Sequence, residues 1–392
     1  METKETFTPE VMEAPARVGQ RRKAITIGLP SCASKGDKRF PLTPEGAAVL
    51  IELGIHILIE RGAPKPIHYS DNAYVKAGAE IVTREEAFRA DIVIHLAPLD
   101  EADAKAMKRG AMLLTLLSLC RQSKTTVKAL LDRKICSIAL DLIEDRHSNL
   151  PFADILQEID GRAAVAIASA LLADPVHGKG ILLGGVAGIV PCEVLIIGSG
   201  IAAAAAARSA SGAGALVRIF DNDVYRLRTT TRDLGPWAVG SALHPKVLHN
   251  ALRSADIVVY SEDTDTFTVG ADIVADMKKG VVVFDLTADC GKAFPTLPCI
   301  DLSDAVPEIS SVRHCYVNAG SAVPRTVAMA LSNTLITFMR DIIACDDTLN
   351  AVKLLPGIQK AAYTFLGKVV NPQVAEIVGL RPVDINIYLS LS

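Results

Sequence analysis

Short apolar runs alternate with helix-forming stretches through the first part of the chain. The runs that predict strands are 24–29, 55–60, 90–96, 112–117 and 135–142. The stretches between them that predict helices are 43–53, 70–77, 100–108 and 124–131. The runs are continuously apolar rather than alternating, which is typical of strands covered on both faces. This rhythm predicts a parallel, doubly wound sheet.

A second series begins after residues 151–172, an Ala- and Ile-rich stretch that predicts a connecting helix. The predicted strands of this series are 194–197, 216–220, 256–260, 281–285 and 315–318. Only helices are expected after it, at 324–343, 349–365 and 372–378. A helical tail of this kind is expected to pack back on the first domain.

The second series opens with a glycine pattern. The apolar run Val194–Ile197 leads into Gly198-Ser199-Gly200-Ile201-Ala202-Ala203 and an Ala-rich helix. Gly198 permits a tight turn, Gly200 lets the backbone approach a diphosphate, and a small third residue allows the helix to pack on the strand. The helix would then point its free N–H groups and positive dipole end at the phosphates. We therefore expect residues 198–202 to contact a dinucleotide.

An acidic residue ends the next predicted strand. Asp221 follows the strand 216–220 and lies 21 residues after Gly200, close to the spacing of about 20 expected for a ribose-binding carboxylate. A carboxylate there accepts hydrogen bonds from a ribose diol and repels a 2′-phosphate. The pattern favours NAD over NADP, and the alternative is a tight turn that binds no ligand.

These patterns predict an α/β protein with two doubly wound parallel-sheet domains, the second of them a Rossmann domain that binds NAD. A polar N-terminal arm is expected at 1–23. The first domain is expected to be discontinuous, comprising 24–150 and 323–392, and the Rossmann domain is expected at 151–322.

Composition narrows the classes of partner and compartment. The formal net charge is -3, so nothing in the charge balance favours nucleic acid or an anionic membrane. The eight cysteines form no Cys-x-x-Cys pair, which favours buried thiols in a reducing compartment over disulfides, and no metal site is expected. No apolar run has the length of a membrane span, and we expect a cytoplasmic protein.

Further segments carry a family resemblance, namely Lys38–Pro44, Ser70-Asp71 with Tyr74, Ala77–Ala79, Glu158–Arg162, Gly180–Pro191, Asp221–Leu227, Phe284–Gly291 and Cys315–Thr326. Through them nearly the whole chain resembles the alanine dehydrogenase and transhydrogenase α-subunit family, and it is most similar to the alanine dehydrogenases. The resemblance implies two domains with a cleft between them. It also implies a homo-oligomer, a hexamer or a dimer.

Alanine oxidation needs a cation for the substrate carboxylate and a group that moves protons. By the resemblance, Arg39 binds the carboxylate in the first, substrate-binding domain, and Asp289 lies beside the nicotinamide and the substrate. Asn318 matches a residue near the nicotinamide and Arg226 one near the adenosine ribose. Each of Arg39 and Asp289 also has a plain interpretation, as a surface arginine and as a loop-capping aspartate.

Two positions depart from the family's alanine dehydrogenases. Those enzymes carry a lysine where an ungapped alignment places Ala97, and a histidine where this chain has Ser118. Both residues bind and protonate the 2-oxo acid, and loss of such a group typically lowers the rate by ~10²–10⁴-fold. His95 is a candidate substitute after a local shift, although a histidine on an apolar strand is more often a core residue.

Four interpretations stay open. The first is an NAD-dependent amino-acid dehydrogenase that interconverts alanine or a related amino acid with its 2-oxo acid and ammonia. The second is an NAD-binding homologue with lost or altered catalysis, which Ala97 and Ser118 favour. The third is transhydrogenase-like hydride exchange, which needs a membrane partner and a second nucleotide domain. The fourth is reductive coupling of a 2-oxo acid to an amine, which needs a larger pocket.

Overall fold

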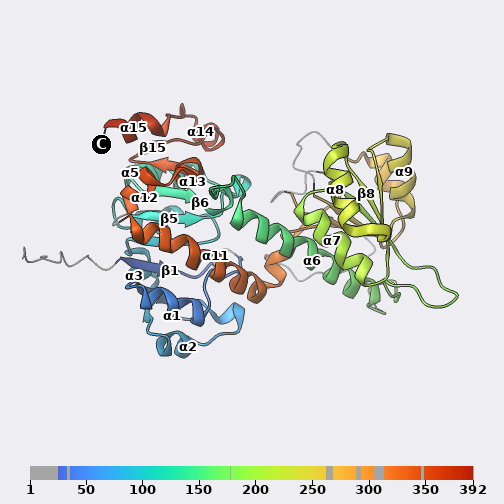
Figure 1. The fold of residues 1–392 in the computed structure, drawn as a ribbon, viewed down its shortest axis with the longest axis horizontal. Coiled ribbons are helices and arrows are strands. Elements are labelled where there is room, and N and C mark those ends of the chain that lie inside the picture. Colours follow the sequence, from blue (N-terminus) through green and yellow to red (C-terminus); the bar gives the residue numbers. More distant parts are fainter. Residues whose placement is uncertain are drawn as a thin grey trace, which may run out of the picture.

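The chain forms two lobes joined by one long helix, α6 (Pro151–Ala173), with α11 (Pro324–Ala344) running beside it (Figure 1). The computed structural model describes residues 25–32, 36–176, 178–261, 268–287, 293–303, 313–345 and 348–391. The predicted N-terminal arm lies outside these residues. Each lobe contains one sheet and is treated below as the first or second domain.

The first domain is built on an eight-stranded sheet. Its strands are β1 (Thr26–Leu29), β2 (His56–Glu60), β3 (Glu80–Val82), β4 (Ile92–Ile94), β5 (Met112–Thr115), β6 (Cys136–Ala139), β14 (Ala362–Phe365) and β15 (Lys368–Val369). The order across the sheet is β15-β14-β6-β5-β4-β1-β2-β3, and the strands from β6 to β3 are parallel. The chain therefore reverses its direction of winding between β1 and β4, as in a doubly wound fold.

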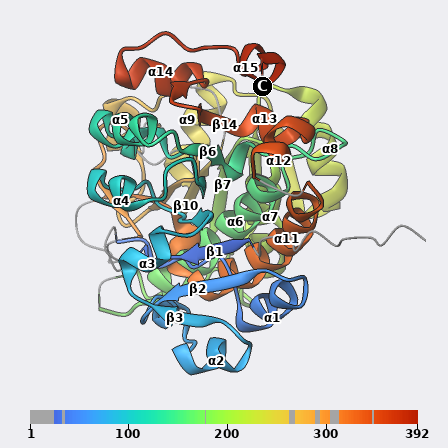
Figure 2. The ribbon, with the colours of Figure 1, turned by 90° about the vertical axis from the view of Figure 1, so that its left-hand side faces the viewer.

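Helices cover both faces of this sheet, which explains why the central strands β4 and β5 are buried at every position. The helices are α1 (Pro44–Glu52), α2 (Asp71–Lys76), α3 (Arg84–Phe88), α4 (Glu101–Ala106), α5 (Lys124–Asp132), α12 (Thr348–Leu354), α13 (Pro356–Ala361), α14 (Pro372–Val378) and α15 (Ile385–Leu391), with 3₁₀ turns η2 (Lys65–Ile67), η3 (Leu119–Arg121) and η4 (Leu140–Leu142). Figure 2 shows α3, α4 and α5 on one face, and α1, α11 and α12 on the other.

Local sequence signals begin these helices. Thr43 caps α1 by accepting the Gly46 N–H at 3.2 Å, and Pro44 takes the first helical position. Thr83 and Glu86 form a reciprocal capping box at the start of α3. Sequence analysis anticipated α1 in this way, but it missed α3 and the short strand β3 before it.

The end of the chain returns to the first sheet. The expectation of a helix over 349–365 is wrong, because Pro356 interrupts the helix and residues 362–365 form β14, which pairs antiparallel with β6. β15 follows after a turn at Leu366 and Gly367, both with positive φ. An antiparallel pair added to a parallel sheet leaves little trace in a sequence, since the strand is only four residues long. The exact domain boundaries stay a prediction.

The second domain contains a seven-stranded parallel sheet. Its strands are β7 (Glu193–Ile197), β8 (Leu216–Phe220), β9 (Ala238–Ser241), β10 (Ile257–Tyr260), β11 (Val282–Asp285), β12 (Cys299–Asp301) and β13 (Cys315–Val317). The order is β12-β13-β11-β10-β7-β8-β9, so the winding reverses between β7 and β10. This is the Rossmann arrangement that the sequence predicted. The short strands β9 and β12 were not predicted.

The helices of the second domain are α7 (Ile201–Gly212), α8 (Val224–Leu234), α9 (Pro245–Ser254) and α10 (Ala271–Asp276), with 3₁₀ turns η5 (Gly235–Trp237) and η6 (Ala319–Ala322). The connecting helix α6 packs closely on α7. Gly161 makes this possible, because a Cβ at that position would lie 2.1 Å from the Ala202 carbonyl oxygen. The glycine in the Glu158–Arg162 segment is therefore a packing requirement.

Within the described part of the chain, α11 is the one helix long and apolar enough to cross a membrane. It packs against α1 and α6, and its buried residues include Val327, Leu331 and Leu335. A core helix meets the same criteria of length and composition.

Candidate functional site at the domain junction

The glycine turn between β7 and α7 has two distinct glycine positions. Gly198 has φ 105°, and a Cβ there would lie 2.9 Å from the Ser261 hydroxyl and 3.0 Å from its backbone. Gly200 is the N-cap of α7, and a Cβ there would have no neighbour within 4 Å. Gly198 thus makes the turn, and Gly200 leaves open space at a helix N-terminus, where N–H groups lack intrahelical partners.

Asp221 follows β8 as predicted, and its carboxylate is buried. Oδ1 accepts the Asp223 N–H at 2.7 Å, and Oδ2 accepts the Ser199 hydroxyl. The side chain of Ser199, in the glycine turn, therefore fixes the acidic end of the neighbouring strand. The two halves of the predicted dinucleotide motif lie in direct contact.

The Arg226 guanidinium forms an ion pair with the Asp221 carboxylate. Its Nε and Nη2 lie 3.2 and 3.0 Å from Asp221 Oδ2, while 44% of its side chain is exposed. Arg226 lies in the first turn of α8, whose N-cap is Asp223. A ribose diol that binds Asp221 must share the carboxylate with Arg226 or displace it.

Two further residues were predicted at this edge, Asp289 and Asn318. Asp289 lies outside the described residues. Asn318 follows β13 with φ 56°, and its Nδ2 donates to both carboxylate oxygens of Asp301, each at 2.9 Å. Asp301 ends β12 and also accepts the Ser303 N–H at 2.8 Å.

The first domain places an ion pair after β1. Arg39 Nη2 lies 2.6 Å from Asp37 Oδ2, and Arg39 Nε lies 3.0 and 3.1 Å from the two oxygens. Burial lowers the pKa of Arg39, but Asp37 and then Asp160 raise it above its ordinary value. Burial raises the pKa of Asp37, but Arg39 and then Arg121 hold it below its ordinary value. The plain interpretation of Arg39 as a surface arginine does not fit this burial.

His95 follows β4, the strand next to β1, and is fully buried. Its Nδ1 donates to the Ala97 carbonyl at 2.5 Å, and its Nε2 has no hydrogen-bond partner among the described residues. Burial lowers the pKa of His95, but the Cys32 thiol and the Ala97 carbonyl raise it to about 9. Cys32, which sequence analysis counted only as a thiol, is thus a neighbour of the imidazole.

The two departing positions lie at the same edge of the first sheet. Ala97 is buried, and its carbonyl also lies 3.4 Å from the Thr115 hydroxyl. Ser118 is partly buried with φ 40°, and its carbonyl accepts the Arg121 N–H at 2.9 Å as η3 begins. Neither side chain replaces the lysine or histidine that the resemblance implies.

Side chains from both domains meet at one place, which we call the domain junction. Arg121 of η3 pairs with Asp301 of β12, and Asp160 of α6 accepts the Gly320 N–H at 2.6 Å. Because Asp160 also raises the pKa of Arg39, the predicted carboxylate-binding arginine is near this contact. Sequence analysis missed Arg121 and Asp301. The available signal was their position at the carboxyl end of a strand, where ligands bind in open parallel sheets.

Comparisons with known proteins agree with this architecture. The family model for the alanine dehydrogenase/PNT N-terminal domain matches residues 28–159, and that for the C-terminal domain matches residues 164–372. An alanine dehydrogenase of Staphylococcus haemolyticus is 31% identical over 365 residues, which cover 91% of this chain and 97% of the relative. One of Methanococcus maripaludis is 31% identical over 360 residues, covering 90% and 96%.

Comparisons with solved structures also find an alanine dehydrogenase and a transhydrogenase. An L-alanine dehydrogenase superposes with a TM-score of 0.81 at 26% identity, covering 91% of this chain and 99% of that one. A transhydrogenase from Sinorhizobium meliloti has a TM-score of 0.70 at 18% identity, covering 88% of this chain and 99% of that one. This likeness supports the fold alone. With two matching domain models and near-full-length relatives, the chain belongs to the alanine dehydrogenase/PNT family.

Proposed function

We propose that this protein is an NAD-dependent dehydrogenase that oxidises the CH–NH₂ carbon of alanine or a related amino acid to the 2-oxo acid and ammonia, or runs the reverse reaction. One observation carries the proposal. A dinucleotide-type turn with an acidic partner follows a strand of one sheet, a guanidinium that suits a carboxylate follows a strand of the other, and Arg121 and Asp301 join the carboxyl ends of the two sheets.

The residues of the second domain fit a dinucleotide. Backbone N–H groups of residues 198–202 would hold the diphosphate in the open space at Gly200, and Asp221 would accept the adenosine ribose beside Arg226. The bound nicotinamide supplies a hydride acceptor. Asn318, fixed by Asp301, would hold the nicotinamide end. The buried Asp221 carboxylate would repel a 2′-phosphate, which favours NAD over NADP.

On the substrate side, Arg39 would bind the α-carboxylate. Asp37 occupies its Nε and Nη2, so the site presents Nη1 of a guanidinium that is fixed in orientation. Asp289 is proposed to assist proton transfer beside the substrate. His95 is the second candidate, and it would act through a local movement because its imidazole is buried.

The alternative is an NAD-binding homologue with lost or altered catalysis. The observation that favours it is the burial of His95, together with the small side chains of Ala97 and Ser118 at the family's proton-transfer positions. This alternative predicts cofactor binding without turnover. Transhydrogenase-like exchange and reductive amine coupling rest on no further contact in the described residues.

We also propose a cytoplasmic homo-oligomer, a hexamer or a dimer, that acts on a small molecule. The support for self-association is a turn in the glycine-rich segment that exposes Leu182, Val186, Ile189 and Val190. None of the six cysteines whose side chains the structure describes forms a disulfide, which suits a reducing compartment.

A screen for turnover tests the proposal. Single amino acids are incubated with NAD, and 2-oxo acids plus ammonium with NADH, while the absorbance of the reduced cofactor is followed. Turnover that is lost in Asp289→Asn supports the dehydrogenase. Cofactor binding by calorimetry without turnover of any amino acid supports the non-catalytic alternative.

A further inference from the structure

A second guanidinium lies at the domain junction beside the proposed carboxylate site. Arg121 contacts Asp301 across the junction, with 25% of its side chain exposed. Its charge also helps to lower the pKa of Asp37, the partner of Arg39. Arg39 follows β1 and Arg121 follows β5, and only β4 separates these two strands, so both arginines lie at the carboxyl edge of the first sheet.

Both arginines keep unused donors. Arg39 donates to Asp37 through Nε and Nη2, and Arg121 reaches Asp301 through Nη2. Within the part of the chain that the structure describes, Nη1 of Arg39 and both Nε and Nη1 of Arg121 have no hydrogen-bond partner. Each of these free N–H groups can donate a charge-assisted hydrogen bond to a carboxylate.

The Asp301 carboxylate has hydrogen-bond donors other than Arg121. It also accepts Asn318 Nδ2 on both oxygens at 2.9 Å and the Ser303 N–H at 2.8 Å. An incoming carboxylate could therefore share or take Arg121 without leaving the Asp301 carboxylate unsatisfied. Arg121 is thus available for exchange, whereas among the described residues Asp37 has side-chain donors from Arg39 alone.

The residues beside Arg121 include the two positions that depart from the family's alanine dehydrogenases. Ser118 begins η3, which Arg121 ends, and its carbonyl accepts the Arg121 N–H. Ser118 and Ala97 have small side chains where the resemblance implies histidine and lysine. Because the resemblance implies that both positions face the substrate, their small side chains favour a substrate longer than alanine.

We propose that Arg121 binds a second carboxylate, so that the substrate class is the dicarboxylic α-amino acids of the aspartate and glutamate type. The α-carboxylate lies on Arg39 and the side-chain carboxylate on Arg121. The nearby carboxylates Asp37, Asp160 and Asp301 favour a ligand that also carries an ammonium group, so an amino acid fits better than a plain dicarboxylic acid. This inference rests on the proposed function, whose substrate it specifies.

Calorimetry on NADH-loaded protein tests this without turnover, because an amino acid cannot be oxidised by a cofactor that is already reduced. The ligands are L-glutamate, its neutral isostere L-glutamine, L-aspartate and L-alanine. We expect the better of the two acidic ligands to bind at least about tenfold more tightly than glutamine and alanine. Arg121→Gln should remove that preference and change the affinity for glutamine less than about threefold.

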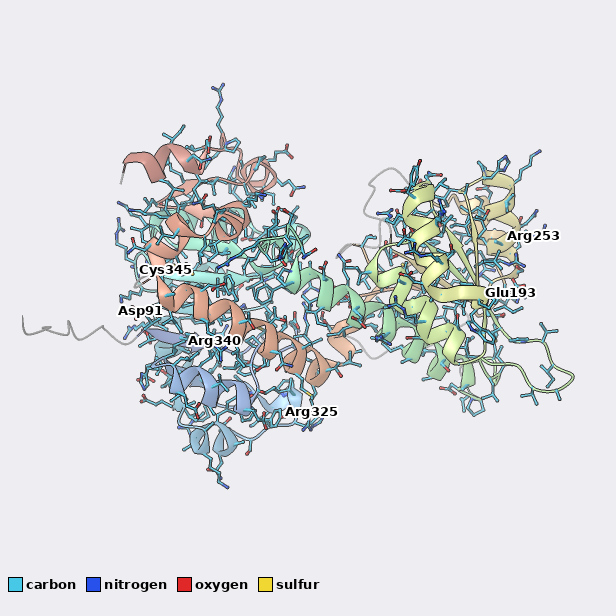
Figure 3. All side chains as sticks on the ribbon, in the orientation of Figure 1. Asp91, Glu193, Arg253, Arg325, Arg340 and Cys345 are labelled. Carbon is cyan, nitrogen blue, oxygen red and sulfur yellow. The ribbon has the colours of Figure 1, made fainter. Side chains whose placement is uncertain are left out.

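The control variant is Arg253→Gln, which makes the same charge change on α9, on the second domain (Figure 3). It should leave all four affinities unchanged. Equal binding of glutamate and glutamine, an equal loss for all ligands in Arg121→Gln, or no binding of any amino acid overturns the inference. Arg121-dependent glutamate binding without turnover of any amino acid supports the inference and contradicts the dehydrogenase instead.

Discussion

The two domains have the same core strand order but differ in what lies at the point where the winding reverses. In the second domain, between β7 and β10, the site is an open backbone turn at Gly198 and Gly200. In the first domain, between β1 and β4, the edge is filled by side chains, namely Asp37, Arg39 and His95. Each sheet thus has a carboxyl edge where the winding reverses, and the residues at that edge decide which ligand it suits.

The largest expected effect concerns the side-chain site. Arg39→Met leaves Asp37 buried and unpaired, and should lower the free energy of unfolding by about 3–5 kcal/mol. Adding Asp37→Asn should recover part of this loss, since the buried charge is then removed. Urea denaturation measures both variants.

The matched control is Arg89→Met, in a pair with Glu85 whose side chains are both 64% exposed. Its effect on stability should be far smaller. Equal effects of Arg39→Met and Arg89→Met would mean that Arg39 is an ordinary surface arginine.

His95 makes the first domain sensitive to pH. Its pKa rises from 6.5 to about 9 on folding, so its contribution to stability is complete below pH 6.5 and is lost as the pH rises through 9. The difference corresponds to a contribution of about 3 kcal/mol. Stability measured from pH 6 to pH 10 should fall more steeply for the wild type than for His95→Gln. His249→Gln, at a partly exposed histidine beside Asp276, should keep the wild-type slope.

The backbone site should respond to a side chain that fills it. Gly200→Val places atoms in the space proposed for the diphosphate and should weaken NADH binding roughly 100-fold, about 2.7 kcal/mol, without lowering the melting temperature much. Gly212→Val, at the other end of α7 and also in open space, should bind NADH normally. Fluorescence titration of NADH compares them, and equal affinities would remove the diphosphate from this turn.

The smallest expected effect tests the close packing of the connecting helix α6 on α7, the helix that begins at the proposed diphosphate site. Gly161→Ala brings a methyl group against the Ala202 carbonyl, a contact of 2.1 Å without relaxation, and should destabilise the protein by about 1–3 kcal/mol. The better helix propensity of alanine offsets up to about 1 kcal/mol of this. Thermal unfolding of Gly212→Ala provides the control, and an increase in stability of both variants would contradict the close packing.

The same contrast explains what the sequence could predict. The backbone site has a local signature, because Gly198, Gly200 and Asp221 are fixed by turn geometry and strand spacing. The positions of the central strands followed from apolar runs, and the start of α1 matches its cap Thr43. Strand β14 was missed because its pairing with β6 joins residues more than 200 positions apart.

The side-chain site has no such signature. Arg39 was found only through the family resemblance, and its partner Asp37 was not identified. Arg121 and Asp301 lie 180 residues apart in the sequence, and only the packing of the two domains brings them together. Likewise, the burial of His95 beside Cys32 depends on tertiary contacts that periodicity does not encode.

The most direct test of the account follows the hydride itself. An amino acid that turns over is prepared with deuterium at Cα and incubated with the protein and NAD, and the reduced cofactor is analysed by mass spectrometry and NMR. The account predicts one deuterium at C4 of the nicotinamide, on a single face, and no label in cofactor recovered from Gly200→Val under the same conditions. Reduced cofactor that carries no deuterium, or the absence of any reduced cofactor with all amino acids tried, would contradict it.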